Sequence, residues 1–276
     1  VPADLRAELR PYQVDGFRWA CRLAALGAGA CLADDMGLGK TVVTLAVLLH
    51  RAADGPALVV APTSVGPNWR AEAWRFAPTL RVHEVVDSAA AAALPELGAG
   101  DLVVVSYALA VIAAPVLAAR TWSTLVVDEA QAVKNADTQR HKCLVRVPAR
   151  FRLALTGTPI ENRLQDLWSL FALVNPGLLG TSSQFARRYA RPIEAGDRAV
   201  QQQLHRLIAP FVLRRTKAAV LPDLPARTVV DRAVALGPTQ AAVYEAVRRA
   251  AAEAAEAAEA SDDRSDTIVL LEHLAD

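Results

Sequence analysis

The chain has 276 residues, enough for one large domain, or one domain with an appended piece, to bury a substantial core. Lysine and arginine number 30 and aspartate and glutamate 29, a formal charge of +1, so the overall balance neither indicates nor excludes a nucleic-acid partner. Cys21, Cys31 and Cys143 stand singly without zinc-ligand spacing, which favours reduced core residues over a metal–thiolate site.

The first ten residues, VPADLRAELR, lack the apolar core of a signal peptide. We therefore expect an intracellular protein, cytoplasmic and nucleoid-associated in a bacterium, or nuclear in a eukaryote.

Short uninterrupted apolar runs recur in the first part of the chain. Such runs are typical of strands buried on both faces, and the stretches between them are long enough for helices. The pattern predicts an α/β fold with a parallel sheet between layers of helices. The runs stand at 30–33, 57–61, 102–105, 124–127 and 152–155.

The stretch 102–119 carries no charge and raises the question of a membrane span. A span needs about 20 predominantly apolar residues, whereas this stretch is short, rich in alanine, and broken by Ser106, Tyr107 and Pro115. It predicts a buried strand followed by a buried helix, and no membrane partner.

Beyond about residue 162 the pattern becomes mainly helical, at 164–174, 182–190 and 200–215. Residues 227–236 have the alternating pattern of a strand, with successive side chains on opposite faces, and predict an added strand. Pro238 opens a run of alanine and glutamate that predicts a helix, and the polar SDDRSD after it predicts a loop or linker.

The stretch ACLADDMGLGKT has the parts of a phosphate-binding loop in order. An apolar run comes first. Gly37 and Gly39 allow close backbone approach to an anion, Lys40 suits the β- and γ-phosphates, and the Thr41 hydroxyl suits magnesium. The apolar residues that follow predict a helix whose N-terminus faces the phosphates.

Asp34 occupies the position of the first glycine in the usual loop pattern. We expect Asp34 to adopt the turn there, which aspartate tolerates better than most residues. The alternative is a glycine-rich turn that only caps a helix.

A second motif, LVVDEAQ, places Asp128 and Glu129 directly after a buried run. An acidic residue at the end of a strand beside a phosphate loop is suited to hold Mg²⁺, and an adjacent carboxylate can polarise the attacking water. Without the loop, the same pair could be a solvated helix start.

Four motifs in this order, LRPYQVDGFRW, DDMGLGKT, DEAQ and LTGTP, resemble those of the Snf2-type helicase-like ATPases, DNA translocases of helicase superfamily 2. The similarity covers about the first 240 residues. It implies a RecA-like P-loop NTPase lobe with a helical insertion after LTGTP. The domain organisation expected from the resemblance is a lobe core at 1–165, a helical insertion of the same lobe at 166–226, and at 227–276 a returning strand, an Ala/Glu-rich helix and the start of a linker.

The resemblance assigns roles at the nucleotide. It makes Gln13 the adenine-reading residue, which suits a carboxamide because it can pair with adenine in two places. Asp35, which stands where the family usually has glutamate, belongs to the nucleotide loop with Gly37, Gly39, Lys40 and Thr41. Thr41 and Asp128 then hold Mg²⁺, and Lys40, Asp128 and Glu129 form the catalytic set.

The resemblance also assigns residues to DNA contact or to coupling. Without the resemblance, the segment PTSVGPNW would be an ordinary loop with a helix cap, and the basic cluster near residue 215 would be a solvated face. The set comprises Pro62, Thr63, Ser64, Asn68 and Trp69 along a DNA strand; Gln131, Thr156, Gly157 and Thr158 in coupling; and Arg214, Arg215 and Lys217 in motor coupling or beside DNA.

The implied function is the ATP-binding lobe of a DNA-dependent ATPase that translocates on double-stranded DNA and remodels protein–DNA complexes, using ATP and Mg²⁺. Further partners implied are a DNA-bound protein such as RNA polymerase and a second RecA-like lobe, whose motifs do not follow within these 276 residues. By itself the chain is then expected to bind ATP and DNA weakly and to turn little ATP over. The alternative is a stand-alone nucleotide-dependent binding or regulatory module without hydrolysis. A small-molecule kinase would explain neither LTGTP nor the helical segment.

Overall fold

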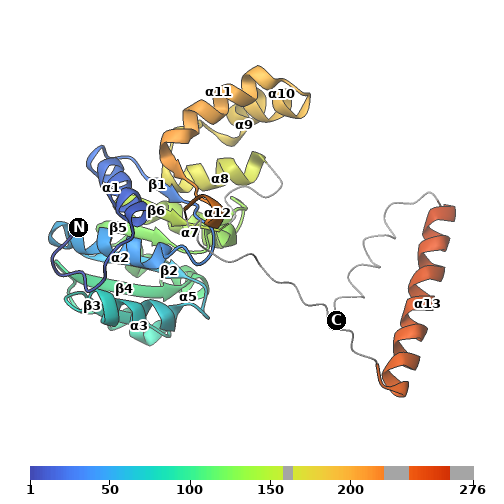
Figure 1. The fold of residues 1–276 in the computed structure, drawn as a ribbon, viewed down its shortest axis with the longest axis horizontal. Coiled ribbons are helices and arrows are strands. Elements are labelled where there is room, and N and C mark those ends of the chain that lie inside the picture. The colour runs from blue at the N-terminus through green and yellow to red at the C-terminus, as the bar shows by residue number, and fades with distance from the viewer. Residues whose placement is uncertain (158–163, 221–235, 262–276) are drawn as a thin grey trace. The chain divides into compact units, whose positions relative to one another are not determined.

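The computed structural model describes residues 1–157, 164–220 and 236–261 (Figure 1). The chain separates into two compact units, Val1–Leu224 and Pro225–Asp276. The second unit contains helix α13 (Pro238–Ser261), which confirms the predicted alanine- and glutamate-rich helix. Most of the predicted strand at 227–236, and all of the polar stretch beyond Ser261, lie outside the described residues.

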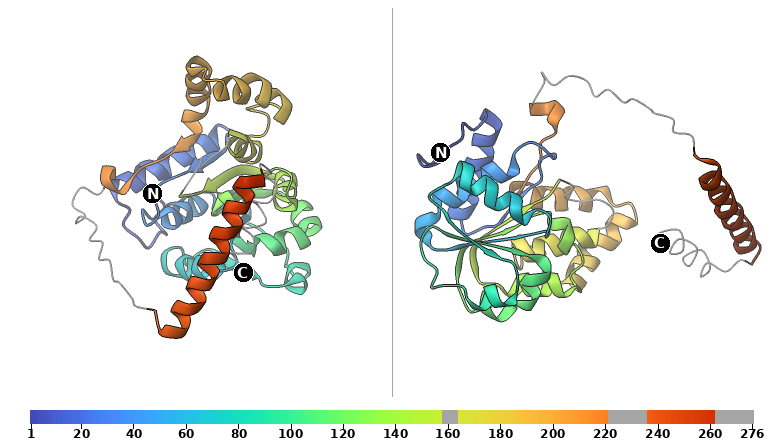
Figure 2. Two further views of the ribbon diagram at one scale, coloured as in Figure 1. Left: turned by 90° about the vertical axis from the view of Figure 1, so that its right-hand side faces the viewer. Right: turned by 90° about the horizontal axis from the view of Figure 1, so that it is seen from below.

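A parallel sheet forms the centre of the first unit, and the prediction of an α/β fold is confirmed (Figures 1 and 2). The strand order is β3-β4-β2-β5-β6-β1-β7, and every pair of neighbours is parallel. All five predicted apolar runs are strands. The strands are β1 (Ala30–Leu32), β2 (Ala57–Ala61), β3 (Arg81–Val85), β4 (Asp101–Ser106), β5 (Trp122–Val127), β6 (Ala149–Leu155) and β7 (Val212–Leu213).

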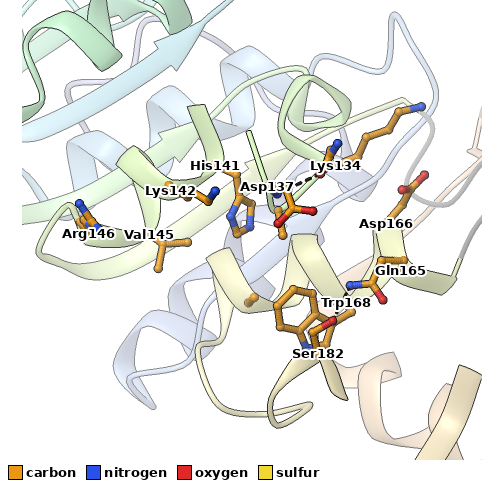
Figure 3. Close-up of a pocket in the computed structure, with 13 residues that line it drawn as sticks. Lys134, Asp137, His141, Lys142, Val145, Arg146, Gln165, Asp166, Trp168 and Ser182 are labelled. Atoms are coloured by element: carbon orange, nitrogen blue, oxygen red, sulfur yellow. Dashed lines mark hydrogen bonds between the residues drawn. The ribbon is translucent and has the colours of Figure 1, made fainter. Parts of the chain in front are cut away.

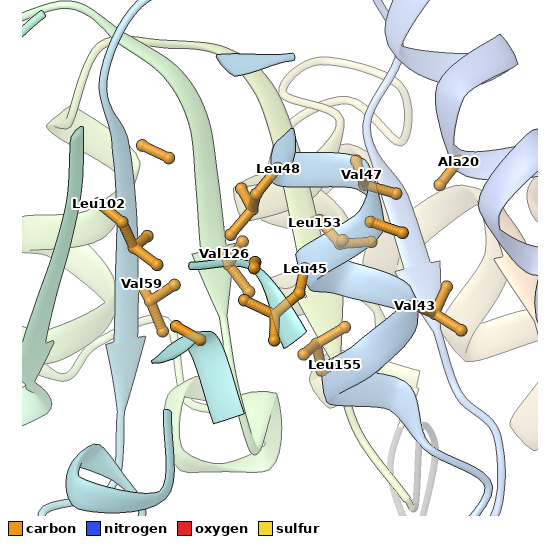
Figure 4. Close-up of a cluster of buried hydrophobic side chains, with 14 of the residues drawn as sticks. Ala20, Val43, Leu45, Val47, Leu48, Val59, Leu102, Val126, Leu153 and Leu155 are labelled. Atoms are coloured by element: carbon orange, nitrogen blue, oxygen red, sulfur yellow. The ribbon is translucent and has the colours of Figure 1, made fainter. Parts of the chain in front are cut away.

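The two faces of the sheet carry separate hydrophobic cores because successive side chains of a strand point to opposite faces. In β2, Val59 packs on one face with Leu45 and Leu48 of α2 (Figure 4), whereas Leu58 and Val60 pack on the other. Helices α1 (Pro11–Ala25), α2 (Lys40–His50) and α3 (Gly66–Phe76) supply the first core. Helices α5 (Tyr107–Ile112), α6 (Ala114–Ala118), α7 (Gln139–Arg146) and α8 (Leu164–Val174) supply the second.

The charge-free stretch 102–119 forms β4 and then two short helices rather than the one helix predicted. The division comes at Ala113, and Pro115 stands in the first turn of α6, where its missing N–H costs nothing. No helix within the described ranges is long and apolar enough to cross a membrane.

The insertion after β6 has a core of its own, with Phe171, Phe185 and Tyr189 among its buried residues. It begins with α8, as predicted for 164–174, and continues through short elements into α11. These elements are α9 (Ser182–Phe185), a π-helical turn η3 (Ala186–Ala190), α10 (Arg191–Glu194), α11 (Arg198–Ile208) and the 3₁₀ turn η4 (Ala209–Phe211).

The prediction of helix across 200–215 is wrong beyond Ile208. Pro210 cannot continue a helix, and the chain returns to the sheet as β7, whose Val212 and Leu213 pair with β1. The segment 166–226, predicted as a helical insertion, therefore also contains a strand of the main sheet. Helix α12 (Lys217–Val220) follows.

The edge strand β3 escaped prediction because its sequence, RVHEV, is mostly polar. Arg81 and His83 both bind the Asp101 carboxylate on the neighbouring strand, at 2.9 and 2.8 Å. Polar cross-strand pairs thus replace apolar burial at this edge. The remaining short elements of the unit are η1 (Ala52–Asp54), α4 (Ser88–Ala92) and η2 (Ala130–Val133).

The three cysteines are free thiols. Cys31 and Cys143 are buried and Cys21 is half-buried, as expected of core residues. Burial raises the pKa of the Cys31 thiol to about 12, which keeps it protonated and unreactive.

Candidate nucleotide site

The loop after β1 turns into α2 at Gly39, which is the N-cap residue of the helix. Gly37 and Gly39 have φ of +85° and +77°, a left-handed conformation that favours glycine. The Lys40 ammonium donates to the Asp34 carbonyl at 2.8 Å, so its side chain folds back over the loop. This is the arrangement expected of a phosphate-binding loop at a helix N-terminus.

Asp34 does not adopt the turn that we expected of it. Among the described non-glycine residues only Glu129 has a positive φ. The Asp34 side chain is instead 2% exposed and forms an ion pair with Arg215, whose backbone N–H and Nε each donate to Oδ1 at 3.0 Å. Because a buried carboxylate needs a paired charge, Asp34 anchors the loop to the segment after β7.

The same segment pairs with the loop through its backbone. The β1–β7 pairing continues through Ala33, whose N–H donates to the Leu213 carbonyl at 2.7 Å, and Asp35, whose N–H donates to the Arg215 carbonyl at 3.0 Å. The Asp35 carboxylate accepts from the Lys217 N–H at 2.9 Å. Asp35 therefore holds the end of the insertion, and its proposed part in nucleotide binding stays a prediction.

Gln13 lies against the loop from helix α1. Its Nε2 donates to the Leu38 carbonyl at 3.0 Å, and its Oε1 accepts from the Arg10 N–H at 2.9 Å. A β-carbon at Gly39 would stand 2.4 Å from Gln13 Nε2, so only glycine leaves room for this contact. The amide keeps one N–H and one lone pair for a ligand, and the adenine-reading role stays a prediction.

Asp128 and Glu129 follow β5, at the carboxyl edge of the sheet that also carries the loop after β1. Asp128 is 7% exposed; its Oδ2 accepts from Trp69 Nε1 at 2.8 Å and its carbonyl accepts from the Tyr107 hydroxyl at 2.6 Å. Burial raises the pKa of Asp128, while the Trp69 and Glu129 N–H groups and the Lys40 charge favour the carboxylate. The influence of Lys40 places the carboxylate within electrostatic reach of the loop.

Glu129 has a left-handed backbone, with φ 48° and ψ 55°. Non-glycine residues held in this region store strain and concentrate at functional sites. The Glu129 carboxylate accepts from Gln131 Nε2 at 2.7 Å, and Gln131 Oε1 accepts from the Thr156 hydroxyl at 3.0 Å. The predicted coupling residues Gln131, Thr156 and Gly157 thus lie together with Glu129, whereas Thr158 lies outside the described residues.

The residues predicted to contact DNA divide into outer and inner positions around the start of α3. The outer ones are exposed or half-buried: Pro62, Thr63, Ser64 and Asn68. Trp69 is fully buried, so its side chain cannot touch DNA directly, and its predicted part in DNA contact or coupling stays a prediction. It lies one position along the helix from exposed Asn68 but faces the core and Asp128.

The basic cluster after β7 divides in the same way. Arg214 and Lys217 are exposed and stay candidates for DNA contact or coupling. Arg215 binds Asp34 and the Tyr12 carbonyl, with its guanidinium 5.2 Å from the Tyr12 ring, so it is not available to DNA.

Tyr107 and Tyr12 are site residues that the sequence analysis missed. Tyr107 directly follows a buried strand, so its place at the carboxyl edge could have been predicted, but its contact with the Asp128 carbonyl could not. Tyr12 adjoins Gln13; its hydroxyl donates to the Leu38 carbonyl of the loop at 3.2 Å, and its own carbonyl accepts from Arg215.

A groove of about 850 Å³ lies apart from this site, lined by residues of α7 and α8 and of the stretch before α7 (Figure 3). Lys134, Lys142 and Arg146 contribute positive charge, and Asp137 and Asp166 offset most of it. No residue of the loop from Asp34 to Thr41 lines the groove, so it is not the nucleotide pocket.

Fold and site together place the chain among the P-loop nucleotide-binding proteins with a RecA-like fold. The glycine loop and the Asp-Glu pair follow β1 and β5, which are separated by β6, at the carboxyl edge of one parallel sheet, where nucleotides bind in this class. The chain belongs to the SNF2-related domain family, whose model matches residues 12–275.

Relatives of known name support this family. The chain is 41% identical over 260 residues to YwqA of Bacillus subtilis, named as an ATP-dependent helicase/translocase, and 34% identical over 274 residues to the TATA-binding protein-associated factor MOT1 of Saccharomyces cerevisiae. These alignments cover 89% and 88% of the chain but only 28% and 15% of the relatives.

Among solved structures, the chain resembles the Sulfolobus solfataricus SWI2/SNF2 ATPase core in complex with double-stranded DNA. The TM-score is 0.75 and the identity 40%, and the match covers 93% of this chain and 55% of that one. The chain thus spans just over half of that core and less than a third of these two curated relatives.

Proposed function

We propose that this chain is the ATP-binding lobe of a DNA-dependent ATPase that translocates on double-stranded DNA and remodels protein–DNA complexes. The observation that carries the proposal is the convergence of the Lys40 loop and the Asp128-Glu129 pair at one edge of the sheet. Family membership gives this arrangement its reaction class.

The residues fit a magnesium–nucleotide complex. The Asp128 carboxylate and the Thr41 hydroxyl offer the oxygen ligands that Mg²⁺ prefers. Among the described residues, Asp128 Oδ1 is bound only by the neighbouring Glu129 N–H at 2.9 Å. When bound, Mg²⁺ would neutralise phosphate charge. Lys40 would leave its carbonyl partner to bind the phosphates, and Glu129, held by Gln131, would orient the attacking water.

Efficient hydrolysis by this site requires an arginine from elsewhere. Arg215 contacts the loop, but its guanidinium is committed to Asp34. An arginine finger raises phosphoryl-transfer rates by about 10³ to 10⁵. We assign that arginine to a second RecA-like lobe, a proposal consistent with the chain spanning 55% of the solved Sulfolobus core.

Double-stranded DNA is the proposed track, and a DNA-bound protein such as RNA polymerase or another complex is the proposed cargo. Thr63, Ser64 and Asn68 present hydroxyl and amide groups beside the N-terminus of α3, and such groups bind backbone phosphates without requiring net positive charge. This accommodates DNA binding in a chain whose formal charge is only +1.

The test compares Lys40→Ala with Lys142→Ala, a matched removal of an exposed lysine outside the loop. Titration of a fluorescent, non-hydrolysable ATP analogue with Mg²⁺ should show about 10- to 100-fold weaker binding for Lys40→Ala, the cost of one charge-assisted contact. Lys142→Ala should bind as the wild type does. Equal affinity of Lys40→Ala and the wild type would refute the nucleotide assignment.

Steady-state ATP turnover with and without duplex DNA then tests whether hydrolysis needs a second lobe. We expect turnover by the 276-residue chain to be low, and to rise with DNA only when a second lobe is supplied. Turnover that DNA raises in the isolated chain, and that Lys40→Ala abolishes, would contradict the need for that lobe.

A further inference from the structure

Trp69 connects the two functional regions of the lobe. It lies in the first turns of α3, directly after exposed Asn68, yet its own side chain is 0% exposed. Its indole N–H donates to Asp128 Oδ2 at 2.8 Å, across 59 residues of sequence. One short helical segment therefore carries the proposed DNA contacts on its outer side and a bond to the catalytic carboxylate on its inner side.

The path between the two sides is short and hydrogen-bonded throughout. The Val65 N–H donates to the Pro62 carbonyl at 2.9 Å, and the Trp69 N–H donates to the Val65 carbonyl at 3.1 Å. A shift of the exposed segment on DNA therefore moves the Trp69 backbone with it. Because the indole is packed in the core, it cannot absorb that shift by swinging into solvent.

Among the described residues, Trp69 is the side chain that hydrogen-bonds the Asp128 carboxylate. Oδ1 accepts from the adjacent Glu129 N–H at 2.9 Å, and the Tyr107 hydroxyl binds the Asp128 carbonyl rather than the carboxylate. Oδ2 is oriented by an indole that belongs to a different element. Movement of α3 therefore changes the orientation of this carboxylate.

Trp122, in the same fold, is a buried tryptophan whose indole N–H bonds to an acceptor with no assigned functional role. It is also 0% exposed, and its indole N–H donates to the Leu117 carbonyl at 2.9 Å. A buried tryptophan needs some acceptor, and a backbone carbonyl suffices. That Trp69 uses the carboxylate assigned to Mg²⁺ is thus not required by burial alone.

We infer that Trp69 is a positioning residue that transmits DNA binding at the start of α3 to the Asp128 carboxylate. The inference rests on the proposed function. It predicts that DNA and the Mg²⁺–nucleotide complex bind with positive coupling, and that the coupling passes through the indole N–H. By linkage the two affinities must change by the same factor.

The experiment measures the affinity of an ATP analogue with Mg²⁺, with and without saturating duplex DNA, for the 276-residue chain and for Trp69→Phe and Trp122→Phe. Both substitutions keep an aromatic ring in the core and remove one indole donor. We expect DNA to tighten nucleotide binding by about 5-fold or more in the wild type and in Trp122→Phe. In Trp69→Phe the ratio of nucleotide affinity with DNA to that without DNA should fall to about one. Fluorescence anisotropy should show that this variant still binds DNA.

Equal DNA-induced ratios in Trp69→Phe and the wild type would overturn the inference and leave the proposed function intact. A wild type that binds no DNA would overturn both. Thermal unfolding checks that the two phenylalanine variants are folded to the same degree. If Trp69→Phe loosens the core, 3-benzothienylalanine at position 69 keeps the two-ring shape without the N–H and should give the same loss of coupling.

Discussion

Replacing Arg215 by methionine should destabilise the lobe far more than removing an exposed arginine. The guanidinium is paired with Asp34, and the side chains are only 14% and 2% exposed. Breaking a buried ion pair from one side costs about 3 to 5 kcal/mol, since the remaining charge is left unpaired in the core. Arg70→Met is the matched control, because Arg70 is 70% exposed and lies 3.4 Å from Glu84; it should cost about 0 to 1 kcal/mol.

Urea unfolding followed by tryptophan fluorescence measures the difference. All tryptophans lie in the first unit, so the signal reports on the lobe and not on α13: they are Trp19, Trp69, Trp74, Trp122 and Trp168. The double variant Asp34→Asn with Arg215→Met should recover part of the loss, because no unpaired charge then remains. If Arg215→Met costs no more than Arg70→Met, the pair does not anchor the loop and the reasoning fails.

Two further predictions test the loop and the sheet edge. Gly39→Ala puts a β-carbon 2.4 Å from Gln13 Nε2, at a residue with φ of +77°. The affinity for an ATP analogue should therefore fall about tenfold or more, while thermal stability falls little. Unchanged affinity would show that the loop can relax. The second prediction concerns Asp101 on β4, beside the edge strand β3. Burial raises the pKa of Asp101, but hydrogen bonds from Arg81, the Gly98 N–H and His83 outweigh burial and lower this pKa to about 2. Because this pKa lies below the ordinary value of 3.8, Asp101 stabilises the fold at higher pH and loses that contribution as the pH falls from about 4 to about 2. Asp101→Asn should therefore flatten the acid limb of a stability–pH curve; an unchanged limb would mean that other carboxylates dominate it.

The parts of the fold that the sequence predicts well are those with a local physical cause. Runs such as 57–61 and 124–127 can satisfy their apolar side chains only inside a sheet covered on both faces, and both are strands. The strands β3 and β7 lack such a signal. Arg81 and His83 make β3 polar, and β7 has two residues that become a strand only beside β1.

The same division holds at the site. Gly39 and Lys40 predict a phosphate loop because the turn and the lysine are adjacent in the chain. The expected turn at Asp34 was wrong because the decisive partner, Arg215, lies 181 residues away. Trp69 was placed along a DNA strand together with Asn68, because the sequence near it does not reveal which face of the helix meets the core.

The sequence by itself determined the parallel α/β fold, the phosphate loop and the acidic pair after β5, because each follows from neighbouring residues and their backbone preferences. Only the tertiary structure decided that Asp34 holds Arg215 and that Trp69 holds Asp128. Those choices depend on which groups meet in the buried interior, where every charge and indole N–H must find a partner whatever its distance along the chain.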